Sequence, residues 1–218
     1  MPRETRTVSV VEIEGLLVAD PPEAWAAAGF AVDPDGVCRV GGVRIRLVGR
    51  DAGTGIVGWS LRGVAADLAD LDGVPSSVSD EPADNPAIHP NGATGIDHVV
   101  LLSPDLRRTV AAFEALGVSP RRERDGELGG QPIRQIFFRL GAVVVEVIGS
   151  ADAADEGPSS LWGITYDVQD IDAIATFLGE RTSPVKDAVQ PGRRITTLRH
   201  RDLGMSVRTA LISPRPPR

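Results

Sequence analysis

The stretch GIDHVVLLSPDL (residues 95–106) carries the features on which the fold prediction depends. Its first part is an apolar run interrupted only by Asp97 and His98, which is typical of a strand buried in a sheet. Ser103 can accept a hydrogen bond from the free amides of a first helical turn, and Pro104 suits the first helical position. We therefore predict a strand that passes directly into a helix.

The residues that follow extend this prediction to a complete module. Leu106, Val110, Phe113 and Leu116 recur at helical spacing and predict one apolar stripe that packs on a sheet, and Gly117 is suited to end the helix. Three strand-like runs come next, at residues 121–124, 133–140 and 142–148. The module therefore reads β-α-β-β-β.

The same order of strand, helix and closing glycine occurs four times along the chain. The four leading apolar runs are residues 10–18, 56–64, 96–102 and 161–168, and the four closing glycines are Gly29, Gly73, Gly117 and Gly179. The fourth unit continues with strands at 185–188, 194–200 and 206–212. The first unit is shorter, with Asp20 and Pro21 at its helix start and strands at 37–40 and 43–48. The second unit keeps a strand and a helix over 65–72, and a loop rich in Ser, Pro, Asp and Asn follows over 75–95.

These repeats predict an α+β fold of four tandem βαβββ modules, of which the first two are degenerate. Residues 75–95 and 150–160 lack apolar periodicity and are expected to be linkers. We expect a degenerate N-terminal half over 1–90 and a C-terminal domain over 91–218, with modules at 95–149 and 160–214. The first half is short of strands, so the two halves are expected to pack as one body.

Composition excludes several classes of protein. The 218 residues include 42% hydrophobic and 24% charged side chains, which is ordinary for a globular protein. The net charge of −7 argues against nucleic acid, and the arginines of 121–124 and 193–201 are interpreted as solvated strand faces. No apolar run reaches the roughly 20 residues of a membrane helix. The first residues lack a secretory signal and Cys38 is the single cysteine, so a cytoplasmic location is expected.

The C-terminal modules resemble the vicinal-oxygen-chelate superfamily, which includes glyoxalase, bleomycin-resistance and dioxygenase domains. GIDHVVL and SPDL resemble the first strand and helix of its module, and FFRLG (137–141) and VVVEV (143–147) resemble the last two strands. The likeness covers residues 95–213 and, more weakly, 8–74. It implies paired modules that curl into an open barrel-like cleft, where His or Glu on first and last strands hold a divalent metal.

Carried over residue by residue, the resemblance implies His98 and Glu146 as metal ligands, with Glu146 also as the catalytic group. The metal implied is Zn, Mn, Fe, Ni or Mg. The matching positions of the fourth module are Gly163 and either Thr209 or Ala210, and those of the first unit lie near Gly15 and Arg46. Only one module therefore keeps ligands. A metal there would be held weakly with waters or with a third ligand from elsewhere, for which His89 and His200 are the remaining histidines.

The residues themselves give an independent argument for a site. Glu146 stands in a run of valines and isoleucines, where an unpaired carboxylate is costly. His98, a metal or a ligand could each be its partner, so the two side chains are expected to meet in a cleft. The alternative is that His98 and Glu146 are unrelated structural residues.

Further candidates for lining the cleft are weaker. Gln135, Phe137 and Arg139 share one strand face and line either the cleft or a solvated surface, and Arg139 could bind an anion. Trp162 and Tyr166, like Trp59, are expected in the core, with a ligand platform as the alternative.

Three functions stay open at this point. The chain is a metal-assisted enzyme of the lyase, isomerase or dioxygenase type, a non-catalytic binder that sequesters a small molecule, or a structural or regulatory module with a closed cleft. The expected partner is a small molecule, without nucleic acid or membrane, and the protein is expected to be a monomer or a homodimer.

Overall fold

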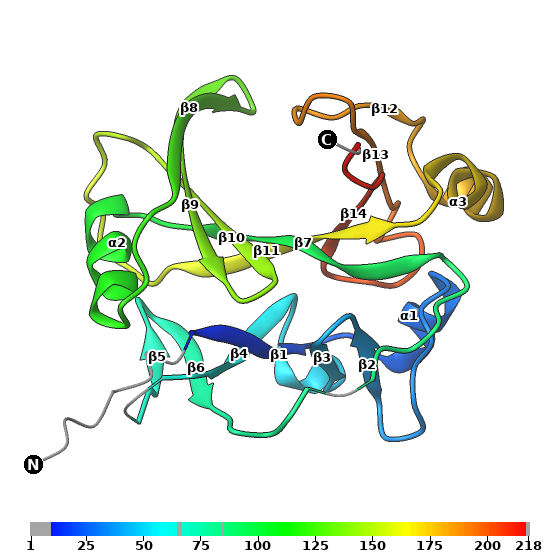
Figure 1. Cartoon of the computed structure of the whole chain (residues 1–218), viewed down its shortest axis with the longest axis horizontal. Helices are drawn as coiled ribbons and strands as arrows, with labels where there is room; N and C mark the ends of the chain where they lie inside the picture. The colour runs from blue at the N-terminus through cyan, green and yellow to red at the C-terminus, as the bar shows by residue number, and fades with distance from the viewer. Residues whose placement is uncertain (1–9, 65–66, 84, 217–218) are drawn as a thin grey trace, which may run out of the picture.

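The computed structural model describes residues 10–64, 67–83 and 85–216, which form two curled β-sheets stacked one over the other (Figure 1). The N-terminal sheet consists of β1 (Glu12–Val18), β2 (Val37–Val40), β3 (Val43–Leu47), β4 (Ile56–Arg62), β5 (Asp70–Leu71) and β6 (Val74–Val78). The C-terminal sheet consists of β7 (Ala93–Leu102), β8 (Arg122–Leu128), β9 (Gln131–Leu140), β10 (Val143–Gly149), β11 (Ser160–Val168), β12 (Lys186–Asp187), β13 (Arg194–Thr197) and β14 (Arg208–Ile212).

Few helices accompany these strands. They are α1 (Pro22–Ala27), α2 (Leu106–Ala115) and α3 (Ile171–Leu178), with 3₁₀ turns at Arg50–Ala52 and Gly179–Arg181. In the described part of the chain no helix has the length and hydrophobicity needed to cross a membrane. The strand-rich α+β class predicted from the sequence is confirmed.

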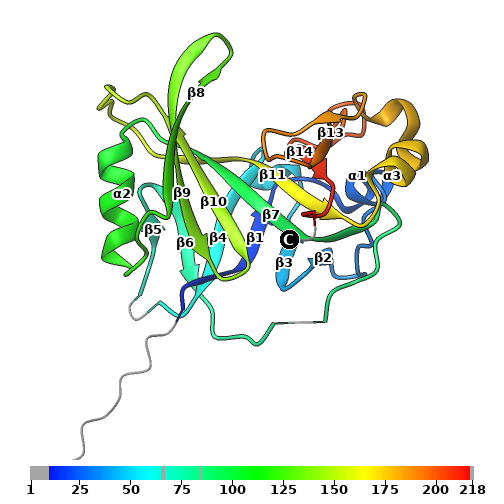
Figure 2. The ribbon, with the colours of Figure 1, turned by 45° about the horizontal axis from the view of Figure 1, so that its top comes forward.

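The C-terminal sheet has the order β12-β13-β14-β11-β7-β10-β9-β8. Its central strands β7 and β11 are antiparallel, and each has the last strand of its own module as a parallel neighbour, β10 beside β7 and β14 beside β11. The sheet curls so that β8 and β9 rise on one side and β12 and β13 on the other (Figures 1 and 2). The concave face between these two sides contains the site described below.

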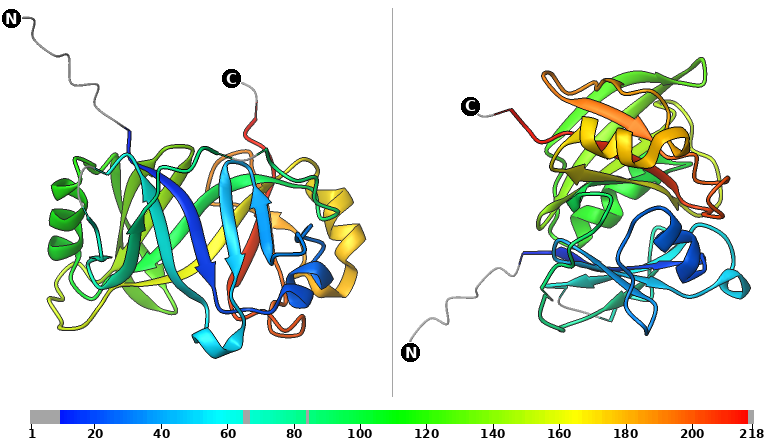
Figure 3. Two further views of the ribbon diagram at one scale, coloured as in Figure 1. Left: turned by 90° about the horizontal axis from the view of Figure 1, so that it is seen from below. Right: turned by 90° about the vertical axis from the view of Figure 1, so that its right-hand side faces the viewer.

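The N-terminal sheet has the order β2-β3-β1-β4-β6-β5. Here too the two central strands, β1 and β4, are antiparallel, and β3 and β6 are their parallel neighbours. The right-hand view of Figure 3 shows this sheet as a separate layer beneath the other sheet.

Aromatic side chains fill the space between the layers. Phe113 of α2 stacks on Phe138 of β9 at a centroid distance of 4.2 Å and meets the edge of Trp59 of β4 at 6.4 Å. Toward the other end, Tyr166 of β11 lies against Trp25 and Phe30 of the N-terminal half. One hydrophobic core thus includes residues from both sheets.

The predicted second helix is wrong in its described part. Residues 67–69 are irregular, Asp70–Leu71 is strand β5, and β6 occupies residues for which a loop is predicted from Pro75 onward. Residues 65–66 of that helix lie outside the described residues. Asp72 and Gly73 both have positive φ, 53° and 85°, which is the backbone of a tight hairpin turn. Gly73 therefore closes a hairpin and not a helix.

The predicted helix starts need two corrections. Asp20 makes no capping bond to α1, and instead accepts hydrogen bonds from the indole of Trp25 at 3.1 Å and the amide of Ser206 at 2.7 Å. The cap of α2 is Asp105, not Ser103, and its carboxylate accepts from the amides of the first turn.

Candidate functional site

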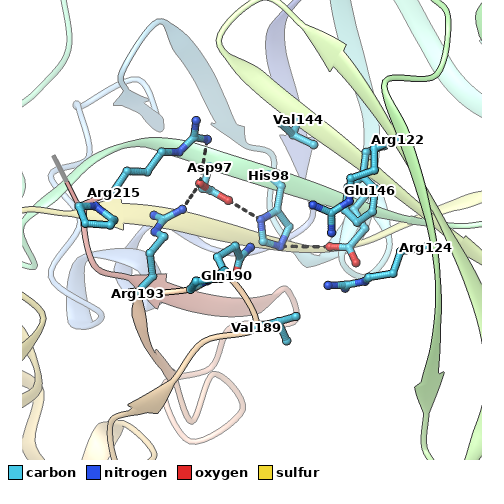
Figure 4. Close-up of a pocket in the computed structure, with 13 residues that line it drawn as sticks. Asp97, His98, Arg122, Arg124, Val144, Glu146, Val189, Gln190, Arg193 and Arg215 are labelled. Carbon is cyan, nitrogen blue, oxygen red and sulfur yellow. Dashed lines mark hydrogen bonds and ion pairs between the residues drawn. The ribbon is translucent and has the colours of Figure 1, made fainter. Parts of the chain in front are cut away.

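A cavity of about 490 Å³ lies on the concave face of the C-terminal sheet. Side chains from β7, β8, β9 and β10 form its floor and one wall, and residues 189–193 with the C-terminal segment 215–216 form the opposite wall (Figure 4). The two walls come from distant parts of the sequence, so only the fold brings these residues together.

The structure brings His98 and Glu146 together at the floor of this cavity. Nε2 of His98 lies 3.4 Å from Oε2 of Glu146. The cause is the parallel register of β7 and β10, in which Val144 stands opposite His98 and Glu146 stands opposite Val100. Alternate residues of a strand share one face, so His98 and Glu146 both point to the concave side.

Asp97 is part of the same arrangement, and sequence reasoning misses it. Its Oδ2 lies 2.7 Å from Nδ1 of His98. Neighbouring residues of a regular strand point to opposite faces, but the pairing of β7 with β11 shifts between Ile96 and His98, so that Asp97 is an extra, bulged residue. The sequence carries no signal for this bulge.

Asp97 is a buried carboxylate with two cationic neighbours. Nη1 of Arg193 lies 2.6 Å and Nη2 of Arg215 3.5 Å from its Oδ1. Burial by itself would raise the pKa of Asp97, but the hydrogen bonds and charges of His98 and Arg193 outweigh it and hold that pKa well below its usual range. An ionised carboxylate can only accept hydrogen bonds, so Nδ1 of His98 carries the proton of this contact.

Arg193 also links the cavity to its surroundings. Its Nη2 donates to Asp167 at 2.6 Å and its Nε donates to the carbonyl of Ser213 at 2.8 Å. Burial and the nearby charge of Asp97 raise the pKa of Asp167. Arg193 therefore fixes the wall segment 189–193 to β7, β11 and the C-terminal segment.

The second carboxylate oxygen of Glu146 accepts a hydrogen bond from a side-chain amide. Nε2 of Gln135 donates to Oε1 of Glu146, and Oε1 of Gln135 accepts from Nε of Arg124 at 2.8 Å. The guanidinium thus fixes the orientation of the amide, which then presents its NH₂ group to the carboxylate. The buried acid of the apolar strand has an imidazole and an amide for partners.

The other predicted lining residues are distributed differently. Phe137 lines the cavity, and Gln135 borders it through Glu146. Arg139 lines a neighbouring hollow, where its Nε donates to the carbonyl of Gly141 at 2.8 Å. Trp162 is absent from the described lining and packs under the guanidinium of Arg208.

Tyr166 is a correction to the predicted cleft residues. It is fully buried on the convex face, because Thr165 pairs with His98 and the next residue of β11 points to the opposite face, toward the N-terminal half. Its packing in the core is the alternative that sequence analysis favours.

Neither remaining histidine supplies a third ligand. His89 accepts from the amide of Ala31 at 3.0 Å and contacts the carbonyl of Arg39 at 3.0 Å, inside the N-terminal half. His200 borders a separate hollow beside Arg50 and Met205. Both lie outside the lining of the cavity that holds His98.

The donor set does not fit a catalytic divalent metal. Such centres usually have three protein ligands, and no group of three or more His, Cys, Asp or Glu side chains placed to hold a metal occurs among the described residues. His98 and Glu146 are two donors, and Arg122 and Arg124 bring positive charge to the same cavity. The position of Gly163 also has no room for a ligand, since a Cβ there would lie 2.8 Å from the carbonyl oxygen of Arg208.

Comparison with known proteins identifies the family of this region. Residues 97–197 match the Glyoxalase/Bleomycin resistance protein/Dioxygenase superfamily. The chain has no match among curated proteins.

Solved structures share the fold at low sequence identity. A mutant of 4-hydroxymandelate synthase from Streptomyces coelicolor is 18% identical with a TM-score of 0.63, over 95% of this chain and 93% of that one. A xylose isomerase-like TIM barrel/4-hydroxyphenylpyruvate dioxygenase fusion protein is 14% identical with a TM-score of 0.64, over 97% of this chain and 50% of that one. Methylmalonyl-CoA epimerase from Mycobacterium tuberculosis is 21% identical with a TM-score of 0.45, over 57% of this chain and 91% of that one.

The family match begins at Asp97 and includes His98, Glu146 and Arg193, so it contains the cavity floor and part of both walls. The resemblance seen in the sequence is confirmed for this region. Residues 97–197, which hold the cavity floor, are thus similar to the Glyoxalase/Bleomycin resistance protein/Dioxygenase superfamily.

Proposed function

We propose that this protein binds a small molecule in the cavity above His98 and Glu146 and moves a proton on it. The observation that carries the proposal is the imidazole of His98 held between two carboxylates, 2.7 Å from Asp97 and 3.4 Å from Glu146, at the floor of a cavity. An activity of the isomerase or lyase type follows from this arrangement.

The chemistry can be written with this chain's own residues. Asp97 fixes the proton on Nδ1 of His98, so a neutral ring would have its lone pair on Nε2, the atom that lies 3.4 Å from Oε2 of Glu146 at the cavity floor. Nε2 can take a proton from a C–H bond next to a carbonyl, and the electron pair stays on the substrate as an enolate. The imidazolium so formed lies between two carboxylates, and it can return the proton to the same or another carbon.

The divalent metal implied by the resemblance is not part of this proposal. The resemblance implies His98 and Glu146 as its ligands. Two ligands beside two arginines form a weak site for a cation. No step of the proton transfer depends on a metal.

A non-catalytic binder is the second candidate. It is favoured by the fourth module, where Gly163 and Ala210 occupy the positions at which the family places ligands and have no donor in their side chains. The closed-cleft alternative finds less support, because the cavity is open and Tyr166 packs on the other face.

Hydrogen–deuterium exchange at carbon tests the two candidates. A panel of small 2-oxo and 3-oxo compounds is incubated with the protein in D₂O, and loss of the α-proton signal is followed by NMR. We expect exchange above the buffer rate for at least one compound, at least a hundredfold slower in His98→Ala, since general-base catalysis contributes about 10²–10⁴-fold. Arg139→Gln, outside the cavity, should leave the exchange unchanged. Binding without exchange supports the non-catalytic candidate.

We also propose that the N-terminal half consists of two degenerate modules, with the boundary near residue 90. The matching strand orders of the two sheets support this proposal. Glu14 is the bulged residue of β1, as Asp97 is of β7, and Gly15 occupies the position of His98. Glu14 there accepts from Ser60 at 2.5 Å and forms a buried ion pair with Arg44. At the position of His98, the N-terminal sheet therefore has glycine, and the bulged carboxylate beside it is paired with an arginine.

A further inference from the structure

Arg122 and Arg124, here called the arginine pair, lie on the same face of β8 and line the cavity. They are two residues apart on a strand, so their side chains share one face. The register with β9 places Arg122 opposite Phe137 and Arg124 opposite Gln135. Their guanidinium groups lie 5.3 Å and 5.8 Å from the centre of the Phe137 ring.

The arginine pair differs from the other two cavity arginines in its charge balance. Arg193 and Arg215 both have Asp97 within salt-bridge distance. In residues 10–64, 67–83 and 85–216, neither Arg122 nor Arg124 has a carboxylate partner, and Arg124 donates only to the neutral oxygen of Gln135. Two uncompensated cations therefore face one cavity in a protein whose net charge is −7.

A guanidinium is suited to one kind of ligand. Its planar fork of N–H donors matches the oxygens of a carboxylate or a phosphate, and such charge-assisted bonds are stronger than neutral ones. The ring of Phe137 next to the pair provides an apolar surface for the body of the same ligand. Glu146 lines the same cavity, but its oxygens contact Gln135 and His98, and in the described residues it forms no salt bridge with either arginine of the pair.

We propose that the arginine pair binds the oxyanion of a small organic acid, with the reacting carbon of that acid next to Nε2 of His98. The inference rests on the proposed function and adds the chemical class of the ligand. It also reverses the interpretation of the 121–124 arginines as a solvated face. We assign anion binding to the arginine pair and not to Arg139, because Arg139 lines another hollow.

The two arginines differ in a way that sharpens the test. Arg124 orients the amide that holds Glu146, so its replacement changes both anion binding and the carboxylate. Arg122 has only the ring of Phe137 beneath it, so its replacement removes the charge and leaves the His98–Glu146 contact in place. Arg122 is therefore the residue to change.

The experiment compares probes of one shape and different charge. Benzoate, its neutral isostere benzamide and phenyl phosphate are titrated into the full chain by calorimetry, while the ring resonances of His98 are followed by NMR. The variants are Arg122→Gln, Arg122→Lys and, as a matched control outside the cavity, Arg139→Gln. Comparison of benzoate with phenyl phosphate tells a carboxylate site from a phosphate site.

We expect at least one anionic probe to bind about tenfold or more tightly than benzamide, as for a charge-assisted contact. Arg122→Gln should remove this preference, Arg122→Lys should keep part of it, and Arg139→Gln should keep all of it. Equal binding of benzoate, phenyl phosphate and benzamide, with His98 shifted by each, overturns the anion inference alone. If none of the three shifts His98, the small-molecule site itself is refuted.

Discussion

His98 owes its chemistry to one residue that leaves the regular strand. Without the bulge, Asp97 would point to the convex face and Nδ1 of His98 would lack its carboxylate. With it, Asp97 connects the imidazole to Arg193, and through Arg193 to Asp167 and the carbonyl of Ser213. A change at Asp97 should therefore affect both folding stability and the function of His98.

Asp97→Asn is expected to lower the free energy of unfolding by roughly 2–4 kcal/mol near neutral pH, because a buried cation loses a charged partner. The side chain of Arg193 is only 3% exposed, and Asp167 remains as its second partner. Chemical denaturation of both proteins measures the difference.

The pH dependence of that difference has a definite sign. The folded-state pKa of Asp97 is depressed below the ordinary 3.8, so the stabilisation is fully present above that pH and is lost as pH falls toward the folded-state pKa. The gap between wild type and Asp97→Asn should therefore narrow below pH 3.8. A gap that stays constant into more acidic solution would show that the charge of Asp97 is not its cause.

The sequence predicted the contacts of a single residue where burial of its charge has a high free-energy cost. Glu146 in an apolar strand required a partner, and His98 and Gln135 are its partners. The place of Asp97 was not predictable, since a bulge decides which face its side chain takes, whereas the core position of Tyr166 is the one that the sequence favours. The bulge depends on the pairing of β7 with β11, which lies outside the local sequence.

At the scale of elements, apolar runs bounded by glycine predicted most strands to within a few residues. The prediction failed at 67–73, where Asp72-Gly73 is the turn of a hairpin. Asp-Gly is a known hairpin signal, but the repeat pattern favoured the second of four helices at this place. The carboxylate of Asp72 then binds Ser159 at 2.5 Å, which joins this hairpin to the 150–160 linker.

Strand β11 has a glycine at the position where the resemblance implies a metal ligand, and packing explains why. Gly163 pairs with Arg208 of β14, and a Cβ on Gly163 would lie 2.8 Å from the carbonyl oxygen and 3.2 Å from the Cβ of Arg208. The position therefore requires glycine for steric reasons. Adding a ligand there would require β14 to move.

Gly163→Ala is expected to destabilise the protein by about 1–3 kcal/mol, the usual cost of overpacking. Gly95→Ala is the matched control on the neighbouring strand β7, because a Cβ there meets no atom within 4 Å. The control should be neutral or stabilising by up to about 1 kcal/mol. Thermal and denaturant unfolding of both variants would measure the difference in their free energies of unfolding. Equal free energies would show that β14 moves at little cost to accept the added methyl group.

At the scale of the whole molecule, the N-terminal sheet covers the convex face of the sheet that forms the site. Trp59 meets Phe113, and Trp25 and Phe30 meet Tyr166, so each end of the interface has an aromatic cluster. The sequence predicted this joint packing from the shortage of strands in the first half. The identity of the contacts required the tertiary structure, because they join residues more than fifty positions apart.

Because the two sheets share one core, we expect them to unfold together, even if the N-terminal half and the C-terminal domain meet at a boundary near residue 90. Phe113→Ala removes a fully buried ring between Trp59 and Phe138 and should cost about 3–5 kcal/mol. Native-state hydrogen exchange should then show the same loss of protection for the slowest amides of β1 and of β10. Phe177→Ala, at a side chain 47% exposed on α3, is the control and should have a much smaller effect. Loss confined to β10 would mean that the halves are independent domains, and in that case the cavity floor could be weakened without disturbing the layer beneath it.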